Sequence, residues 1–339
     1  MATTATIIAD DNIPFLEGRI KGAEIRVLPA AYINKEAVRD ADAVLVRTRT
    51  RCDAALLEGS RVRLVATATI GTDHIDTPWC EERGIAVRNA PGCNAPGVAL
   101  YVWASLLRNG FDPHQSTLGV VGCGHVGSIV AQWGRLLGAK VLVCDPPRKD
   151  AGHSDMDYLP LEEVLQRSDA VTLHTPLTRV GKYPTFHLIG KESLRHLKQG
   201  ATLVDAARGE VLETRGVSEA IRDGRIGKAI IDTWEGEPII DRELLELTSV
   251  ATCHIAGYSV EGKQRATRMA LEAVSEILGL EVDLSGLAGE YEEPAGLTAG
   301  RIISAYDPAA MTAALKASPA HFERLRNSYP LHREVRNCT

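Results

Sequence analysis

The segment TLGVVGCGHVG, residues 117–127, decides the fold because an apolar strand pattern runs directly into a glycine-rich turn. Its GCGHVG part matches G-x-G-x-x-G, a pattern that glycine-rich turns can also satisfy by chance. The context makes the match specific. An amphipathic pattern over residues 126–137 predicts a helix, and Asp145 follows about 20 residues later, at the end of the next apolar run. The segment therefore predicts a parallel α/β domain that binds a dinucleotide.

Each position of this turn has a physical role. Gly122 permits the tight turn, Gly124 lets the backbone approach a pyrophosphate, and Gly127 lets the helix pack closely on its strand. His125 and Val126 open the helix, whose N-terminal N–H groups would face the phosphates. A strand-to-helix turn that binds nothing is the alternative interpretation.

Asp145 indicates which dinucleotide is bound. A carboxylate can accept hydrogen bonds from a ribose 2′-hydroxyl but would repel a 2′-phosphate, so the sequence favours NAD over NADP. Arg148, three residues later, weakens this inference slightly. We expect NAD as the cofactor.

Short β-branched runs alternate with amphipathic segments along most of the chain, which predicts the α/β class. A first series of strands is predicted over residues 6–9, 24–28, 43–48, 64–70 and 85–88. A second series is predicted over residues 117–122, 140–145, 170–175, 201–206, 228–232 and 249–254, and six such strands match a doubly wound nucleotide-binding domain.

The boundaries between these parts are marked by composition. Residues 89–97, NAPGCNAPG, are rich in proline and glycine and separate the two strand series. From Ser259 an amphipathic pattern predicts a long helix. Residues 281–300 are predicted to be a linker or irregular segment, and residues 319–329 one more helix.

The bulk composition points to a small-molecule partner. The chain has 339 residues, which suggests two or three domains, and a hydrophobic content of 45% suits globular folding. A net charge of −6 gives no general attraction to nucleic acid or anionic lipid. No signal peptide and no run approaching ~20 apolar residues is present, so we expect no membrane association and a cytoplasmic location.

The seven cysteines are scattered and include no C-x-x-C pair, which argues against a disulfide framework and a zinc site. No metal is expected. Cys144 and Cys253 lie in apolar runs, where a cysteine is usually a small buried hydrophobe. Cys93, in the turn-like PGCN, is the exception.

Three residues form a candidate catalytic set, and each follows a predicted strand end: Arg208, Glu237 and His254. Arginine offers a planar charged fork for a carboxylate, and histidine exchanges a proton near neutrality. The glutamate would orient and charge-balance the histidine. Each alone would be interpreted as structural, but together they suit the oxidation of a hydroxy acid beside a nicotinamide.

Other predicted cofactor contacts also follow strand ends, where ligands lie in doubly wound sheets. They are His174, Thr175, Pro176, Ala206, Ala207, Arg208, Asp232 and Gly257. For His174, a satisfied loop histidine remains an equally good interpretation.

These motifs together resemble the D-isomer-specific 2-hydroxyacid dehydrogenases. The glycine fingerprint, an ARG turn, a D-x-x-E-x-E-P segment and an H-I-A/G-G segment occur in that order, and the resemblance covers nearly all of residues 1–285. It implies that Arg208 binds the substrate carboxylate, Glu237 partners the histidine, His254 is the acid/base and Asp232 lies near the nicotinamide amide.

The resemblance also implies a domain arrangement. A flavodoxin-like substrate domain would comprise residues 1–96 and 259–286, with a Rossmann-type NAD domain, residues 97–258, inserted in it. Residues 287–339 would form a small C-terminal α+β domain, too small to bury much core unaided. The tail, with FERLRNSYPLHRE from Phe322, is similar to a homodimer-forming domain found in one branch of the family.

The same branch acts on a phosphorylated hydroxy acid, and its further motifs are present as ADDNIPF, ATATIGTDHID, CDPPR and HIAGYSVEGK. By this resemblance the substrate contacts are Arg47, Thr48, Thr67 and Tyr258. A solvated basic edge stays an alternative for Arg49 and Arg51, and for Arg47 and Thr48 to a lesser degree.

Two departures from related chains are Leu100, where glutamate is frequent, and Asp205, where asparagine is common. Two other functions stay open. One is a 2-hydroxyacid dehydrogenase of the phosphoglycerate or glyoxylate type. The other is an NADH-sensing, corepressor-like binding protein, because function follows the site and not the fold.

Overall fold

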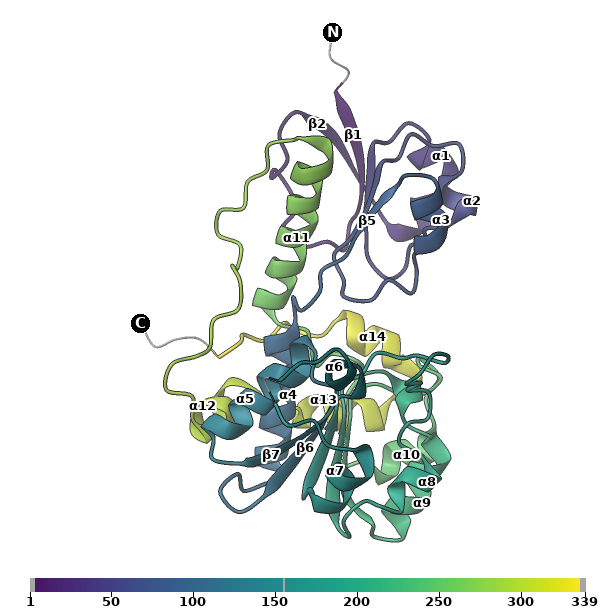
Figure 1. The fold of residues 1–339 in the computed structure, drawn as a ribbon. Coiled ribbons are helices and arrows are strands. Elements are labelled where there is room, and N and C mark those ends of the chain that lie inside the picture. The colour runs from purple at the N-terminus through teal and green to yellow at the C-terminus, as the bar shows by residue number, and fades with distance from the viewer. Residues whose placement is uncertain (1–3, 155, 336–339) are drawn as a thin grey trace. The chain divides into compact units, whose positions relative to one another are not determined.

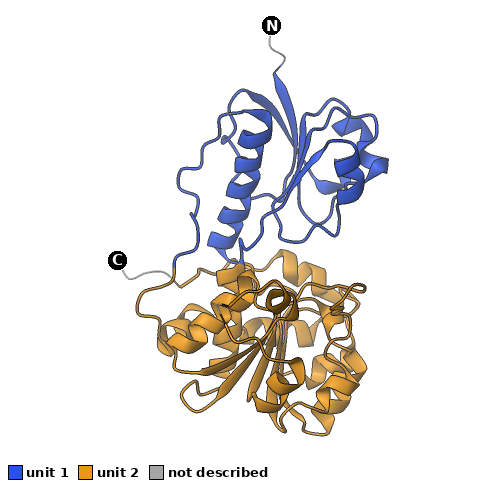
Figure 2. Ribbon diagram, in the orientation of Figure 1, with its two compact units in different colours: residues 1–94, 259–292 blue, residues 95–258, 293–339 orange. Residues whose placement is uncertain are grey.

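The computed structural model describes residues 4–154 and 156–335, and the chain divides into two compact units (Figure 2). Unit 1 comprises residues 1–94 and 259–292, and unit 2 comprises residues 95–258 and 293–339. Each unit is built on one parallel sheet with helices on both faces (Figure 1). The predicted α/β class is confirmed.

Unit 1 has the strand order β2-β1-β3-β4-β5. Its strands are β1 (Ala5–Asp10), β2 (Ala23–Leu28), β3 (Ala43–Val46), β4 (Leu64–Thr67) and β5 (Ala86–Arg88), and its helices are η1 (Ala30–Tyr32), α1 (Lys35–Val38), α2 (Ala54–Leu57), α3 (Thr77–Glu82) and α11 (Val260–Leu278). Side chains alternate between the two faces of a strand, so Ile7 joins the apolar cluster with α11 while Ile8 joins the cluster with α1, α2 and α3.

Local chemistry sets the limits of α11. The hydroxyl of Ser259 accepts a hydrogen bond from the N–H of Gly262 at its start, and Gly279 ends it in the left-handed conformation (φ 68°). Ala270, Leu271 and Val274 recur at helical spacing and are buried against the sheet. The long helix predicted from the amphipathic pattern is therefore present.

Unit 2 has the strand order β11-β10-β9-β8-β6-β7. Its strands are β6 (Thr117–Val121), β7 (Lys140–Cys144), β8 (Ala170–Leu173), β9 (Ala201–Asp205), β10 (Ile226–Ile231) and β11 (Val250–Ala251). Its helices are α4 (Ala95–Arg108), α5 (His125–Leu136), α6 (Pro146–Asp150), α7 (Leu161–Arg167), α8 (Lys191–Leu194), η2 (Gly209–Val211), α9 (Thr214–Arg222), α10 (Arg242–Leu247), α12 (Ala299–Ala305), α13 (Ala309–Ala317), η3 (Pro319–His321) and α14 (Phe322–Asn327).

The doubly wound topology positions the site. From β6 the chain first moves outward to β7, where an isolated parallel bridge joins Val143 and Tyr158, and then returns to β8 on the other side of β6. The winding direction reverses between β6 and β8, which is the point where such sheets bind ligands. In Figure 1, α4, α5 and α12 lie on one side of this sheet and α7, α8, α9 and α10 on the other.

The C-terminal segment packs on unit 2. Thr312 on α13 accepts a hydrogen bond through its hydroxyl from the N–H of Ala251, at 3.1 Å, on the edge strand β11. The rings of Tyr306 and Tyr101 lie 5.8 Å apart, and Phe322 is buried. The sequence predicts a separate unit over residues 287–339, whereas the described residues from Glu293 onward are grouped with the Rossmann-type domain, because their apolar side chains are buried against it.

Candidate active site

The glycine-rich turn fits a dinucleotide at each of its three glycines. Gly122 has a φ of 87°, a conformation that L side chains rarely adopt. A Cβ on Gly127 would lie 1.9 Å from the carbonyl oxygen of Gly122, so only glycine permits this close packing. By contrast, a Cβ on Gly124 would meet no atom within 4 Å, which leaves open space where a pyrophosphate would approach the N-terminus of α5.

Asp145 connects this turn to the strand that follows. Its carboxylate accepts hydrogen bonds from the N–H of Cys123 at 2.7 Å and from the N–H of Arg148 at 3.0 Å, the latter as the N-cap of α6. Two carboxylate oxygens offer about four acceptor sites, so the ribose hydroxyls can still be bound. The Arg148 side chain donates to the Tyr158 hydroxyl at 2.9 Å, an interaction that fits NAD better than a 2′-phosphate contact.

Asp145→Asn is expected to weaken NAD binding by about five- to tenfold, because a hydrogen bond to a charged acceptor is replaced by one to a neutral acceptor. The asparagine side-chain oxygen can still accept one of these two backbone hydrogen bonds, so the turn should persist. Titration of NADH fluorescence measures the change. An unchanged dissociation constant would exclude Asp145 from the ribose site.

The segment after β8 presents two unpartnered polar atoms beside this turn. Nε2 of His174 lies 2.9 Å from the Thr172 hydroxyl, while its Nδ1 and the hydroxyl of Thr175 are buried without a hydrogen-bond partner among the described residues. Burial lowers the pKa of His174 to about 3, so the ring is neutral. Buried polar atoms in proteins usually have a hydrogen-bond partner. These two atoms beside Gly122 are therefore available to bind the cofactor.

The ARG turn after β9 is held by a buried carboxyl. Asp205 accepts hydrogen bonds from the N–H of Ala207 at 3.0 Å and from the hydroxyl of Thr233 at 2.9 Å. A Cβ on Gly209 would lie 2.0 Å from the carbonyl carbon of Trp234. The turn that carries Arg208 is therefore pressed against the start of the next loop, the one that carries Glu237.

Asp205→Asn is expected to remove a pH dependence of stability. Burial, with the charges of Asp232 and Glu237, raises the pKa of Asp205 to about 8 against the hydrogen bonds from Ala207 and Thr233. The folded state therefore holds a proton that the unfolded chain releases near pH 4, and stability falls by up to about 1.4 kcal/mol per pH unit from about pH 4 to pH 8. The asparagine oxygen can accept the hydrogen bond from the Ala207 N–H, and its amide N–H can donate to the Thr233 hydroxyl, so no titrating proton is needed.

Thermal melting at pH 5 and pH 8 tests this prediction. The variant should gain stability over the parent at pH 8 and gain much less at pH 5. Equal shifts at the two pH values would show that Asp205 is ionised in the folded protein.

The histidine and glutamate of the predicted set form a direct pair. Nδ1 of His254 lies 2.6 Å from Oε1 of Glu237, and both side chains stay partly exposed, at 29% and 24%. Burial of Glu237 opposes its ionisation and is the largest influence, but the hydrogen bond and charge of His254 outweigh it and hold the pKa of this carboxyl below its usual value. Nε2 of His254 has no hydrogen-bond partner among the described residues and is open to a substrate.

Asp232 fixes the turn that presents His254. Its carboxylate is 1% exposed and accepts hydrogen bonds from the N–H groups of Ile255 and Ala256 and from the hydroxyl of Thr252. Its carbonyl accepts from the N–H of His254, whose φ of 56° lies in the left-handed region. These four hydrogen bonds hold the histidine in a conformation that is strained for a non-glycine residue.

The parallel order of the strands sets the sequence of groups along one sheet edge. His254 follows β11, Asp232 follows β10 and Arg208 follows β9, so the catalytic candidates occupy one end of the edge. His174 follows β8, and the glycine turn and Asp145 follow β6 and β7, so these cofactor candidates occupy the other end, while the cofactor candidate Asp232 lies among the catalytic candidates. Thr175, Pro176, Ala206, Ala207 and Gly257 lie in the same connections.

The remaining substrate candidates lie in unit 1, at the end of two neighbouring strands. Val46 of β3 is paired with Thr67 of β4, so Arg47, Thr48 and Thr67 share one sheet edge. Nη1 of Arg47 donates to the carbonyl of Asn12 at 3.1 Å, and its Nε is buried without a partner among the described residues. Thr67 is buried, and its hydroxyl lies 2.6 Å from that of Thr69 and 3.2 Å from Nε2 of His74. His74 was not among the sequence candidates.

Tyr258 has a partner that the sequence did not reveal. Nε of Arg326, on α14, donates to the Tyr258 hydroxyl at 3.2 Å. The two residues are 68 positions apart and belong to no common motif, so no local signal could have found this contact.

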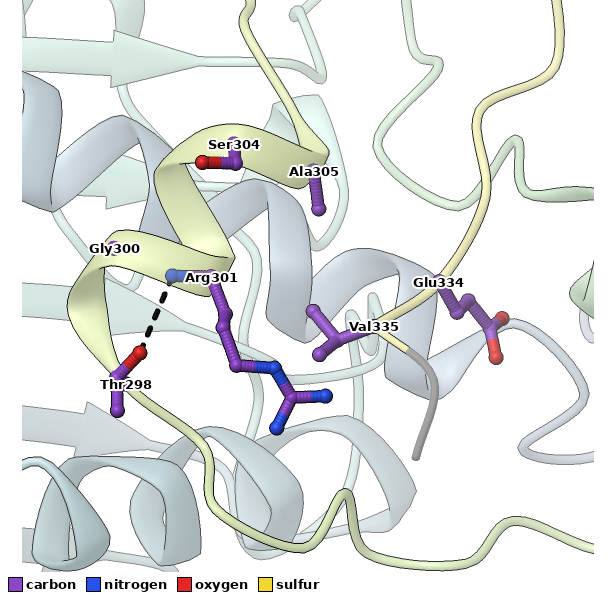
Figure 3. Close-up of a pocket in the computed structure, with 7 residues that line it drawn as sticks. All are labelled: Thr298, Gly300, Arg301, Ser304, Ala305, Glu334 and Val335. Atoms are coloured by element: carbon purple, nitrogen blue, oxygen red, sulfur yellow. Dashed lines mark hydrogen bonds between the residues drawn. The ribbon is translucent and has the colours of Figure 1, made fainter. Parts of the chain in front are cut away.

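The cysteines and a surface hollow on unit 2 do not contribute to this candidate site. The six described cysteines, Cys93 included, are buried and form no disulfide within residues 4–154 and 156–335, and Cys338 lies outside the described residues. Within residues 4–154 and 156–335, no cluster of histidine, cysteine or carboxylate side chains is arranged to hold a metal, and none of the helices is long and apolar enough to cross a bilayer. A shallow hollow on unit 2 contains none of the predicted site residues (Figure 3) and is lined by Thr298, Gly300, Arg301, Ser304, Ala305, Glu334 and Val335.

Comparison with known proteins agrees with this geometry. The family described as "D-isomer specific 2-hydroxyacid dehydrogenase, NAD binding domain" matches residues 98–256, which supports NAD as the cofactor. Among solved structures, the D-lactate dehydrogenase of Aquifex aeolicus, complexed with NAD and lactic acid, is 25% identical and superposes with a TM-score of 0.67 over 80% of this chain and 96% of that one.

Relatives that align with the whole chain identify a narrower family. The erythronate-4-phosphate dehydrogenase of Bacteroides fragilis is 44% identical over 337 residues, covering 97% of each chain. The enzyme of that name from Azotobacter vinelandii is 42% identical, covering 97% of this chain and 93% of the relative. The chain therefore belongs to the erythronate-4-phosphate dehydrogenase family, a group of NAD-dependent oxidoreductases among the D-isomer-specific 2-hydroxyacid dehydrogenases.

Proposed function

We propose that this protein oxidises the 2-hydroxyl of 4-phospho-D-erythronate with NAD, giving (R)-3-hydroxy-2-oxo-4-phosphooxybutanoate for vitamin B6 synthesis. The observation that carries the proposal is the pair formed by His254 Nδ1 and Glu237 Oε1 at 2.6 Å, beside the turn that holds Arg208. The names of the relatives with 39–44% identity supply the substrate.

The residues divide the chemistry as follows. Arg208 binds the substrate carboxylate through its planar guanidinium, which fixes the 2-carbon beside the nicotinamide. His254 takes the hydroxyl proton at Nε2, and Glu237 stabilises the resulting imidazolium through Nδ1. Bound NAD would accept the hydride that leaves the 2-carbon as its hydroxyl becomes a carbonyl. One proton and one hydride leave the substrate, so charge and atoms balance.

The substrate phosphate requires cationic and hydrogen-bond-donating groups, which Arg47 and Thr48 supply in unit 1. The partner-free Nε of Arg47 supports this role, because a buried guanidinium N–H without an acceptor is costly. Thr67 and Tyr258 are assigned to substrate by the family resemblance, with Tyr258 contributing a phenol next to the histidine turn.

Steady-state kinetics with the purified protein test the proposal. NADH formation from 4-phospho-D-erythronate is compared with that from 3-phosphoglycerate, and NADH consumption is compared between the corresponding 2-oxo acid and glyoxylate. We expect the highest kcat/KM for the four-carbon phosphorylated substrate. A higher value for phosphoglycerate or glyoxylate would overturn the substrate assignment, and NADH binding without turnover of any acid would favour a sensor protein.

We also propose that residues 287–339 form a homodimer surface, as the resemblance of this tail suggests. Light scattering coupled to gel filtration gives the mass in solution, and a monomeric mass at micromolar concentration would contradict the proposal.

A further inference from the structure

The C-terminal segment brings a cation to the active-site side of unit 2. Arg326 lies on α14, a helix anchored by Phe322, which is 1% exposed. The Arg326 side chain is itself only 21% exposed, unlike that of Arg324 on the same helix, which faces solvent. A guanidinium this far removed from water requires compensating partners.

The partners within the protein satisfy Arg326 incompletely. Nε donates to the neutral Tyr258 hydroxyl at 3.2 Å, and the nearest carboxylate, Oε1 of Glu323, lies 3.5 Å from Nη1. Glu323 is 43% exposed, so water screens this pair. Nη2 has no hydrogen-bond partner among residues 4–154 and 156–335. A guanidinium carries five N–H donors in a planar fork, so the N–H groups of Nη2 can still donate to a ligand.

Arg326 also lies within electrostatic reach of the catalytic pair. Its charge contributes to the lowered pKa of Glu237, after the effects of burial and of His254. Tyr258, which holds Arg326, follows His254 by four residues, and the carbonyl of Tyr258 accepts from the N–H of His332 at 3.3 Å. Two contacts from the C-terminal segment thus meet at Tyr258.

We propose that Arg326 is a specificity-determining residue that binds the phosphate of the substrate, with Tyr258 holding the guanidinium in place. This inference rests on the proposed function. The substrate carries two anionic groups: Arg208 on the ARG turn is assigned to the carboxylate, and the phosphate, for which Arg47 and Thr48 are proposed, has enough oxygens to bind a further cation. A second half-buried arginine with an unfilled fork matches the phosphate, whose three oxygens accept paired N–H donors. Within unit 2, the C-terminal segment would then favour a phosphorylated acid over an acid that is shorter or lacks the phosphate.

The test compares Arg326→Gln with the parent on two ligands, 4-phospho-D-erythronate and D-erythronate, which lacks the phosphate. D-Erythronate serves as a substrate or, where its turnover is too slow, as a competitive inhibitor. We expect kcat/KM for the phosphorylated substrate to fall about 10- to 100-fold, mainly through KM, because a charge-assisted hydrogen-bond partner is lost. The constant for D-erythronate should stay close to that of the parent.

Two further variants separate binding from structure. Arg324→Gln removes a charge from an exposed position of the same helix and should change neither constant. Arg326→Lys keeps the charge but loses the fork, and should restore part of the affinity for the phosphorylated substrate. NADH titration and thermal melting check that each variant is folded.

The outcomes are distinct. Equal losses on both ligands, or no loss on either, would overturn the role of Arg326 in phosphate binding while leaving the proposed function intact. If the parent protein itself shows no preference for the phosphorylated acid, the proposed function fails, and the inference fails with it.

Discussion

Replacing His254 with alanine is expected to lower kcat by about 10²- to 10⁴-fold, which is the range that a positioned general acid/base contributes. The imidazole Nε2 is the open proton acceptor of the pair with Glu237. NAD binding should be retained, because the glycine turn and Asp145 lie at the other end of the sheet edge. Stopped-flow and steady-state rates with NADH titration give both quantities.

A matched control is present in the same unit. Nε2 of His187 lies 2.7 Å from Oε1 of Glu235, so this second histidine–glutamate pair resembles the first in distance and in partial exposure, although it uses the other ring nitrogen. It lies outside the predicted catalytic set, and His187→Ala should leave kcat near the parental value. If both variants lose activity equally, or if His254→Ala retains it, the acid/base assignment is wrong.

Gly209→Ala is expected to disrupt both the fold around the site and the activity. The added methyl carbon would lie 2.0 Å from the carbonyl carbon and 2.2 Å from the carbonyl oxygen of Trp234, and a backbone atom cannot move aside as a flexible side chain can. Overpacking of this kind costs about 1–3 kcal/mol or more. Any relief must separate the Arg208 turn from the loop that carries Glu237, so kcat/KM should also fall, by at least about tenfold.

Thermal melting and steady-state kinetics measure the two effects. Gly300→Ala is the control, because a Cβ on Gly300 meets no atom within 4 Å and the residue lies in α12. Alanine there should be neutral or stabilise by up to about 1 kcal/mol. A Gly209→Ala protein with the parental melting temperature and activity would show that the two loops are not held together as tightly as this contact requires.

Much of the fold was predictable because each sheet follows local patterns. The apolar run before Gly122, the glycine spacing and the acid at Asp145 specify a strand, a turn and a helix within 29 residues, and the structure has β6, α5 and β7 there. Predicted strand ends were less accurate. The strand expected to reach residue 254 stops at Ala251, and the left-handed φ of 56° at His254 turns the chain out of the extended conformation.

The C-terminal segment was the least predictable part. Residues 281–300 lack periodicity. The helices α12 and α13 are short, and short helices are stabilised mainly by packing their apolar side chains on a neighbouring surface. Tyr306 is buried beside Tyr101, and Thr312 closes the edge of β11, contacts that join residues more than 60 positions apart. No local pattern encodes such a pairing.

By itself, the sequence determined the α/β class, the candidate NAD-binding turn and the residue types of the candidate catalytic set, because glycine geometry and strand periodicity are short-range properties of the chain. Only the tertiary structure decided the distance at which Glu237, already predicted as its partner, reaches His254, the close packing of Gly209 against Trp234 and the contact of Arg326 with Tyr258. These three depend on loops from different strands and on a distant helix, and their distances are fixed only when the sheet brings the strand ends to one edge.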